Sequence, residues 1–145
     1  MLGFEEVKGK IGDILEAKDF IEFALIFGSF AKGRETPLSD VDVGVYLSRP
    51  VDLLTLGQLA TELEKITGRT VDLLILNDLP LKGPAMAYQI VSSGEIVACK
   101  DPSAYVRFKT ETILRYLDTI YLRKTVNRAF LERLKSDKFG EMSHA

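Results

Sequence analysis

A chain of 145 residues with 46% hydrophobic content has the size of one compact domain with its own core. Its net charge of -2 lacks the basic excess typical of proteins that follow a phosphate backbone, so direct nucleic-acid binding is not expected. The single cysteine excludes an internal disulfide. The chain has neither a signal-peptide pattern nor an uncharged stretch of about 18 residues, so the sequence predicts a cytoplasmic protein without a membrane span.

The N-terminal part of the chain predicts one helix and two strands. Apolar residues at helical spacing predict an amphipathic helix over residues 4–18, and the nearly all-apolar residues 21–27 are typical of a strand covered on both faces. Gly28 and Ser29 close this strand, and Ser29 is suited to cap a short helical turn. A polar loop then leads into a second strand over residues 40–47.

The middle of the chain alternates helices and strands. In chain order we expect a helix over residues 51–66, a strand over 71–76, a helix over 84–91 and a strand over 96–99. Gly68 and Gly94 follow the two helices and stop them. The apolar stripes of the first two helices of the chain are expected to lie in the core.

A long charged helix is predicted from Pro102 to about residue 134, followed by a frayed tail over residues 136–145. Its apolar residues cover more than one side, so this helix is expected either to bend or to have a second partner. The sequence therefore predicts a single α/β (α+β) domain over residues 1–145. It has a small mixed sheet with flanking helices in a core of about residues 4–100, and a C-terminal helical extension over about 102–135.

Two aspartates at the start of the second strand are the first candidates for chemistry. Asp40 and Asp42 are two residues apart, so their carboxylates project from the same side of a strand. Their repulsion is costly unless a cation lies between them, and hard oxygen ligands favour Mg²⁺, which takes its other ligands from water and substrate phosphates. An isolated Asp-x-Asp is more often a cap or turn, so this pair alone does not decide the function.

A third carboxylate and a phosphate-binding turn complete the pattern. Asp72 begins the next strand in the same Val-Asp context, so three carboxylates meet if the two strands are neighbours. Gly28 allows a ligand to approach the backbone, and Ser29 at a helix N-terminus is suited to phosphate oxygens. Lys32 could neutralise phosphate charge, although loop cations are usually only solvated. The combination indicates phosphoryl or nucleotidyl transfer, whereas a P-loop is excluded because Arg34 and Glu35 replace its Lys-Ser/Thr.

The spacing Gly-Ser-x10-Asp-x-Asp, with a third Asp on a later strand, resembles the signature of the polymerase-β nucleotidyltransferase superfamily. Within it, the chain is similar to the minimal nucleotidyltransferase (MNT, MntA-like) antitoxins that are paired with HEPN ribonuclease toxins. The segment from Gly94 and the long helix from Pro102 extend this resemblance over nearly the whole chain. Ala98-Cys99 departs from the Leu-Tyr pair of the family, which affects packing more than chemistry.

The resemblance implies an enzyme that uses ATP and two Mg²⁺ ions to transfer AMP to a tyrosine of the HEPN toxin encoded next to it. Gly28 and Ser29 would hold the triphosphate. Asp40 and Asp42 would bind both metal ions, and Asp72 would bind one ion and activate the acceptor hydroxyl.

Two other functions remain open at the level of sequence. The chain could be an antitoxin that neutralises its toxin by binding alone, or a nucleotidyltransferase that modifies a small molecule. Neither the nucleotide base, the acceptor nor the homo- or hetero-oligomeric state follows from the sequence.

Overall fold

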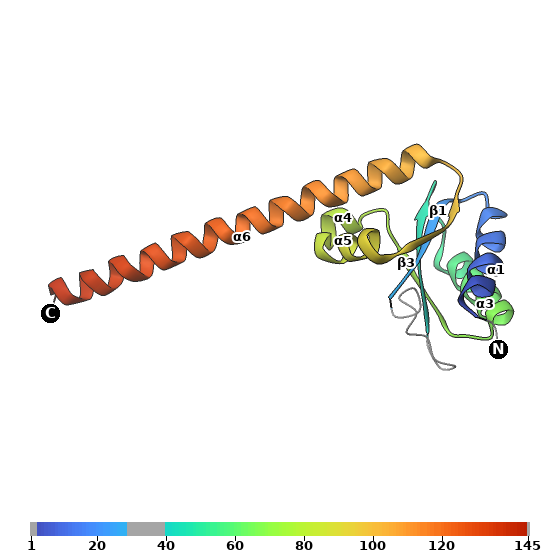
Figure 1. Cartoon of the computed structure of the whole chain (residues 1–145), viewed down its shortest axis with the longest axis horizontal. Helices are drawn as coiled ribbons and strands as arrows, with labels where there is room; N and C mark the ends of the chain where they lie inside the picture. The colour runs from blue at the N-terminus through green and yellow to red at the C-terminus, as the bar shows by residue number, and fades with distance from the viewer. Residues whose placement is uncertain (1–2, 29–39, 145) are drawn as a thin grey trace.

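The computed structural model describes residues 3–28 and 40–144, which form a four-stranded sheet between two layers of helices (Figure 1). The strands are β1 (Ile21–Phe27), β2 (Val41–Leu47), β3 (Val71–Ile75) and β4 (Glu95–Cys99). Their order across the sheet is β3-β2-β1-β4. β1 runs antiparallel to β2 and β4, whereas β2 and β3 are parallel. The mixed α/β class and the four predicted strands are confirmed.

Helices α1 (Phe4–Glu16) and α3 (Leu53–Thr67) cover one face of the sheet. Alternate residues of β2 point into this layer and meet the apolar stripes of both helices. The fully buried members of this cluster include Val7, Ile11, Leu15, Leu63, Val41, Val43 and Val45. Because burying one aliphatic side chain contributes about 1.5–3 kcal/mol, this layer is a main source of stability.

Helix α3 is capped at both ends, by Asp52 and by Gly68. The Asp52 carboxylate accepts a hydrogen bond from the Thr55 backbone N–H at 2.8 Å, and Gly68 ends the helix with a φ of 69°. The buried residues of α3 recur every fourth position, and Leu53 and Leu54 lie outside that stripe. They are 85% and 70% exposed, so the expectation that the whole apolar stripe of this helix is core is wrong at these two positions.

The opposite face of the sheet is covered by α4 (Leu79–Lys82), α5 (Pro84–Ser93) and α6 (Pro102–His144). The buried cluster on this side consists of Phe23, Leu25, Leu76, Ile90, Ala104 and Phe108. Helix α4 was not predicted, because four residues that include a proline give no periodic signal. Cys99 is free and only partly buried against this cluster.

Helix α6 starts at Pro102, as predicted, and the Asp101 carboxylate accepts a hydrogen bond from the Ser103 N–H at 3.0 Å. It then runs without a bend past α4 and α5 and extends away from the sheet (Figure 1). The helix continues to His144, ten residues beyond its predicted end near residue 134. No helix in the described part of the chain combines the length and the hydropathy of a membrane span.

Asn77 joins the segment after β3 to the end of β2. Its side chain accepts a hydrogen bond from the Leu47 N–H at 2.9 Å and donates one to the Leu47 carbonyl at 2.8 Å, as a further strand residue would. Asn77→Ala is expected to lower the free energy of unfolding by about 1–3 kcal/mol. The reason is that the backbone N–H and carbonyl of Leu47, a buried residue, both lose their hydrogen-bond partner. Urea unfolding measures this cost. Thr61→Ala, at an exposed helical position, is the control, and equal stability of both variants would contradict the role of Asn77.

Candidate active site

Three aspartates lie at one end of the sheet, where β2 and β3 begin. Asp42 is the second residue of β2 and Asp72 the second residue of β3, and the two are direct partners in the parallel register. Asp40 comes immediately before β2 and is exposed. The condition under which the sequence predicts a carboxylate cluster, that the two Asp-bearing strands are neighbours, is therefore met.

The face of the sheet on which Asp42 and Asp72 project follows from strand alternation. Val41, Val43 and Val71 are buried in the α1 and α3 layer, so their neighbours Asp42 and Asp72 point to the side of α4, α5 and α6. Asp42 is partly buried, whereas Asp72 is exposed on the edge strand β3. The carboxylate pair can therefore be reached from solvent along the β3 edge.

Gly28 follows β1 directly and lies against Asp42. Its φ is +80°, in the left-handed region that favours glycine, and a Cβ at this position would overlap with Oδ2 of Asp42. The sequence predicts Gly28 as a point of close ligand approach. That the missing side chain also makes room for the Asp42 carboxylate was not predicted, because this contact depends on the pairing of Phe27 with Asp42.

The surroundings of Asp42 favour its protonated form in the absence of a cation. Burial is the main cause that raises its pKa, and the negative charges of Asp72 and Asp40 add to this effect. Both other carboxylates therefore act electrostatically on Asp42.

The raised pKa of Asp42 predicts how the stability of the metal-free protein depends on pH. A carboxyl group with a higher pKa in the folded state stabilises the fold below its unfolded pKa, and this contribution is lost as the pH rises through the folded pKa. In EDTA at neutral pH, Asp42→Asn is therefore expected to melt at the same temperature as the unsubstituted protein or above it. The difference should disappear below about pH 4. Thermal melts across this pH range measure it, and a drop of many degrees at neutral pH would indicate that Asp42 is a structural hydrogen-bonding residue.

The residues present fit a divalent cation bound together with a substrate. Within residues 3–28 and 40–144, no group of three or more His, Cys, Asp or Glu side chains is placed so that it could hold a metal ion. Mg²⁺ does not need such a group, because it usually takes one or two carboxylates and completes its shell with water and phosphate oxygens. The opposed Asp42 and Asp72, with charges that repel each other, provide such a partial ligand set.

Other sequence candidates have different outcomes. Ser29 and Lys32 lie outside the described residues, so their predicted contacts with phosphate remain predictions. Tyr46 shares the strand parity of Asp42, but its ring stacks on Phe23 with centroids 4.8 Å apart. Its side chain is partly buried and packs against the apolar cluster on the α4, α5 and α6 side.

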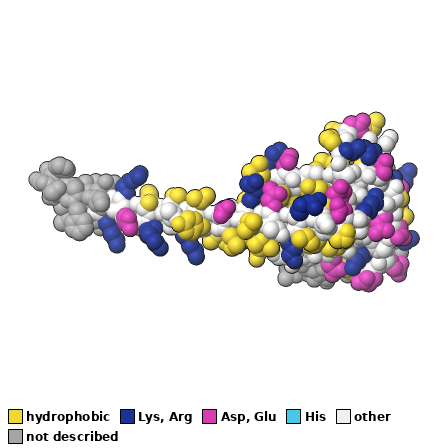
Figure 2. Space-filling view, turned by 90° about the horizontal axis from the view of Figure 1, so that it is seen from above, with side chains coloured by type: hydrophobic (Ala, Val, Ile, Leu, Met, Phe, Trp, Pro, Cys, Tyr) yellow, Lys and Arg dark blue, Asp and Glu magenta, His cyan; other side chains and the backbone are white. Residues whose placement is uncertain are grey.

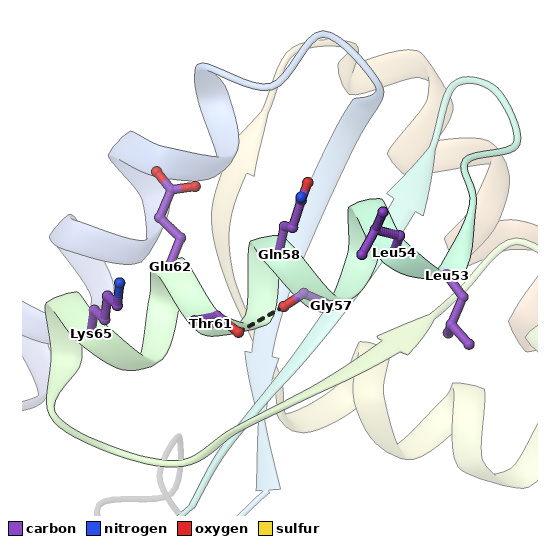
Figure 3. A pocket seen from close by; sticks show the side chains of 7 residues that line it. All are labelled: Leu53, Leu54, Gly57, Gln58, Thr61, Glu62 and Lys65. Atoms are coloured by element: carbon purple, nitrogen blue, oxygen red, sulfur yellow. Dashed lines mark hydrogen bonds between the residues drawn. The ribbon is translucent and has the colours of Figure 1, made fainter.

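A shallow groove on α3 lies apart from these carboxylates. It is lined by Leu53, Leu54, Gly57, Gln58, Thr61, Glu62 and Lys65 (Figure 3). Since α3 covers the opposite face of the sheet from that of Asp42 and Asp72, this groove cannot form part of the same site.

The fold and the carboxylates together define an α/β protein with an acidic, partly exposed pair of aspartates whose chemistry fits a divalent cation. Comparison with known proteins assigns it more narrowly. The sequence model described as "Polymerase beta, Nucleotidyltransferase" matches residues 9–103. The chain belongs to this nucleotidyltransferase family, whose members generally use a nucleoside triphosphate and a divalent metal ion.

Two similar proteins of Methanocaldococcus jannaschii are provisionally named protein adenylyltransferases. One is 37% identical over 78 residues, which cover 54% of this chain and 83% of the relative. The other is 32% identical over 75 residues, which cover 52% of this chain and 76% of the relative. These relatives agree with the assignment of the chain as a nucleotidyltransferase.

The fold is also found in solved toxin–antitoxin structures. A chain of a toxin–antitoxin crystal structure with AMP-PNP aligns with a TM-score of 0.68 and 22% identity over 86% of this chain and 98% of that one. A chain of the structure of tri-AMPylated Shewanella oneidensis HEPN toxin in complex with MNT antitoxin aligns with a TM-score of 0.63. It is 19% identical over 88% of this chain and 98% of that one. These likenesses confirm the polymerase-β-like fold.

Proposed function

We propose that this protein transfers AMP from ATP to a tyrosine hydroxyl of a partner HEPN toxin and thereby acts as its antitoxin. The main observation in support is the placement of Asp72 directly opposite Asp42, with Asp72 exposed on an edge strand. A large acceptor such as a folded protein can approach from this edge. The similarity to proteins named as protein adenylyltransferases, and the fold shared with chains from MNT–HEPN complexes, support the acceptor class.

Each residue of the site has a distinct proposed role. Asp40 and Asp42 would hold two Mg²⁺ ions, which would supply positive charge to offset the charge that develops on the phosphates. Gly28 leaves space beside Asp42, while Ser29 and Lys32 hold the triphosphate. Asp72 would be a ligand of one of these ions, and it orients the acceptor.

In the proposed reaction the tyrosine oxygen bonds to the α-phosphorus while the bond from that phosphorus to the bridging oxygen of the pyrophosphate breaks. Asp72 takes the proton of the tyrosine hydroxyl, and pyrophosphate leaves with its electron pair. Two acidic residues at the ends of adjacent strands thus separate the tasks of holding the phosphate and activating the acceptor.

The proposed roles of Ser29 and Asp72 predict different defects. Ser29→Ala is expected to weaken ATP binding about tenfold. Asp72→Asn should change ATP affinity by less than about threefold and slow single-turnover transfer at least about a hundredfold, because its task lies in the chemical step. Calorimetry with a non-hydrolysable ATP analogue and rapid-quench kinetics measure the two effects separately. Equal losses of nucleotide affinity in both variants would contradict this division.

Co-expression tests whether neutralisation is catalytic. The toxin encoded beside this protein is expressed with either the unsubstituted protein or Asp40→Asn, and growth and the intact mass of the toxin are recorded. We expect rescue of growth together with one or more added AMP units, both absent with Asp40→Asn. Full rescue by Asp40→Asn without added mass would instead identify an antitoxin that acts by binding. AMP transfer to small hydroxyl compounds but not to the toxin would identify a small-molecule enzyme.

A further inference from the structure

Helix α6 is an addition to the catalytic unit. The family match ends at residue 103, two residues into this 43-residue helix. In the relative of 37% identity, the 78 aligned residues already make up 83% of the protein. That relative is therefore too short to contain both the α/β core and a helix as long as α6. Since such relatives are named as adenylyltransferases without room for α6, the helix has a task other than the transfer chemistry.

The outer part of α6 extends away from the body of the protein (Figure 1). Every residue from 121 to 135, a segment that we name the arm, is exposed. The arm nevertheless carries large apolar residues, and it contains five Lys or Arg residues against one Glu in a chain of net charge -2. Figure 2 shows hydrophobic and basic side chains together along the arm where it leaves the body. Such a surface is typical of an element that binds another protein.

One apolar stripe of the arm faces the same way as the side of α6 that packs on the body. The inner part of the helix contacts the body through Phe108, Thr112 and Tyr116, of which the first two are buried and Tyr116 stacks on Tyr88 of α5 with centroids 4.2 Å apart. Eighteen residues correspond to about five helical turns. Three apolar residues lie eighteen positions beyond these contacts and therefore project in the same direction: Val126, Phe130 and Leu134.

This stripe, which we name the underside stripe, continues the side of α6 that packs on the body, beyond α4 and α5. In Figure 1 both short helices lie below α6, and the arm extends past them. They cover the face of the sheet to which Asp42 and Asp72 point. From the end of the body contacts the stripe extends about 27 Å, and a folded protein of about 100 residues has a radius of gyration near 13 Å. A folded protein of that size bound along the stripe would lie on the same side of the sheet as α4 and α5, which is the side to which the carboxylates point.

The charges beside the stripe indicate the chemistry of the occupant. Arg123 lies seven residues before Phe130, and Arg133 lies seven residues after Val126, so both project from about the same side of the helix. A second copy packed stripe to stripe would oppose these arginines with its own. A partner whose apolar groove is flanked by Asp or Glu would neutralise them.

We propose that the underside stripe of α6 is the docking surface for the protein that accepts AMP. The stripe binds an apolar groove between helices of that protein, and acidic residues line the edges of this groove. This inference rests on the proposed function, because it takes the HEPN toxin as the acceptor. Docking on the stripe holds the toxin on the side of Asp72 and converts a bimolecular encounter into a positioned reaction.

A pair of substitutions on opposite sides of the arm tests the docking surface. Phe130 is 57% exposed and Tyr121 is 70% exposed, and their separation of nine positions, about two and a half turns, places them on opposite sides. Phe130→Glu is expected to raise the Kd for the toxin at least about a hundredfold, and Tyr121→Glu to change it by less than about threefold. Binding is measured by calorimetry in EDTA without ATP, so that no transfer takes place. Arg133→Glu should weaken binding about tenfold, and Arg128→Glu, on the other side, should not.

The readouts separate docking from chemistry. With ATP and Mg²⁺, Phe130→Glu should raise the KM for the toxin and leave kcat at saturating toxin and the affinity for ATP unchanged. Equal toxin binding by Phe130→Glu and Tyr121→Glu overturns the docking surface while leaving the proposed function intact if AMP is still added. The docking surface is also overturned if the only effect of Phe130→Glu is to turn a dimer of this chain into a monomer. Stripe-dependent binding without any AMP transfer rejects the proposed reaction but retains the docking surface. If the unsubstituted protein does not bind the toxin, both are rejected.

Discussion

Asp42→Asn and Asp40→Asn are each expected to reduce AMP transfer at least about a hundredfold, a loss comparable to that of a main electrostatic stabiliser of a transition state. Asp42 combines the features of a metal ligand: it is partly buried, it is opposed by Asp72, and its pKa is raised by burial and by the two neighbouring carboxylates. An asparagine of the same shape keeps the packing but lacks the charge that balances a divalent cation.

The measurement is the single-turnover rate of transfer at saturating ATP and Mg²⁺, with Asp78→Asn as control. Asp78 is an exposed carboxylate beside α4, and its replacement is expected to leave the rate unchanged. Transfer at nearly the unsubstituted rate by Asp40→Asn or Asp42→Asn would reject the two-metal assignment.

Gly28→Ala is expected to reduce AMP transfer about as much as Asp42→Asn does, because it displaces the Asp42 carboxylate. The added Cβ would overlap with Oδ2 of Asp42, and the positive φ adds about 1–2 kcal/mol of backbone strain. Gly68 provides a matched control, because its φ is +69° and nothing lies within 4 Å of a Cβ built there.

Gly68→Ala should therefore lower the melting temperature about as much as the strain at Gly28 does, while it retains transfer activity. Thermal melts and transfer rates of both variants, assayed well below their melting temperatures, separate strain from damage to the site. If both variants lose activity equally, the contact between Gly28 and Asp42 has no special role.

The sequence predicts the layers of this fold because its signals are local and strong. The apolar runs of β1 and β2, the glycine that ends α3 and the proline at the start of α6 lie at or within two residues of the observed boundaries. The carboxylate cluster is also predictable, since the Val-Asp pattern at the start of two strands becomes a cluster as soon as these strands pair.

Features that depend on tertiary contacts could not be predicted. The exposure of Leu54 depends on which side of α3 faces the sheet. Because the first turn of α3 carries several leucines, the sequence does not show which of them is buried. The hydrogen bonds from Asn77 to Leu47 replace a strand pairing with one side chain, for which the sequence has no signal. The length of α6 was underestimated because charged residues on all sides of its outer part resemble those of a frayed tail.

The most direct test of the account is AMP transfer with purified components. This protein, the HEPN toxin proposed as its partner, ATP and Mg²⁺ are incubated together, the toxin is weighed by intact mass spectrometry, and the modified residue is mapped by peptide sequencing. The account predicts one or more AMP units on a toxin tyrosine, absent in EDTA and with Asp42→Asn. A toxin that is bound and inhibited by this protein but carries no added mass would contradict it.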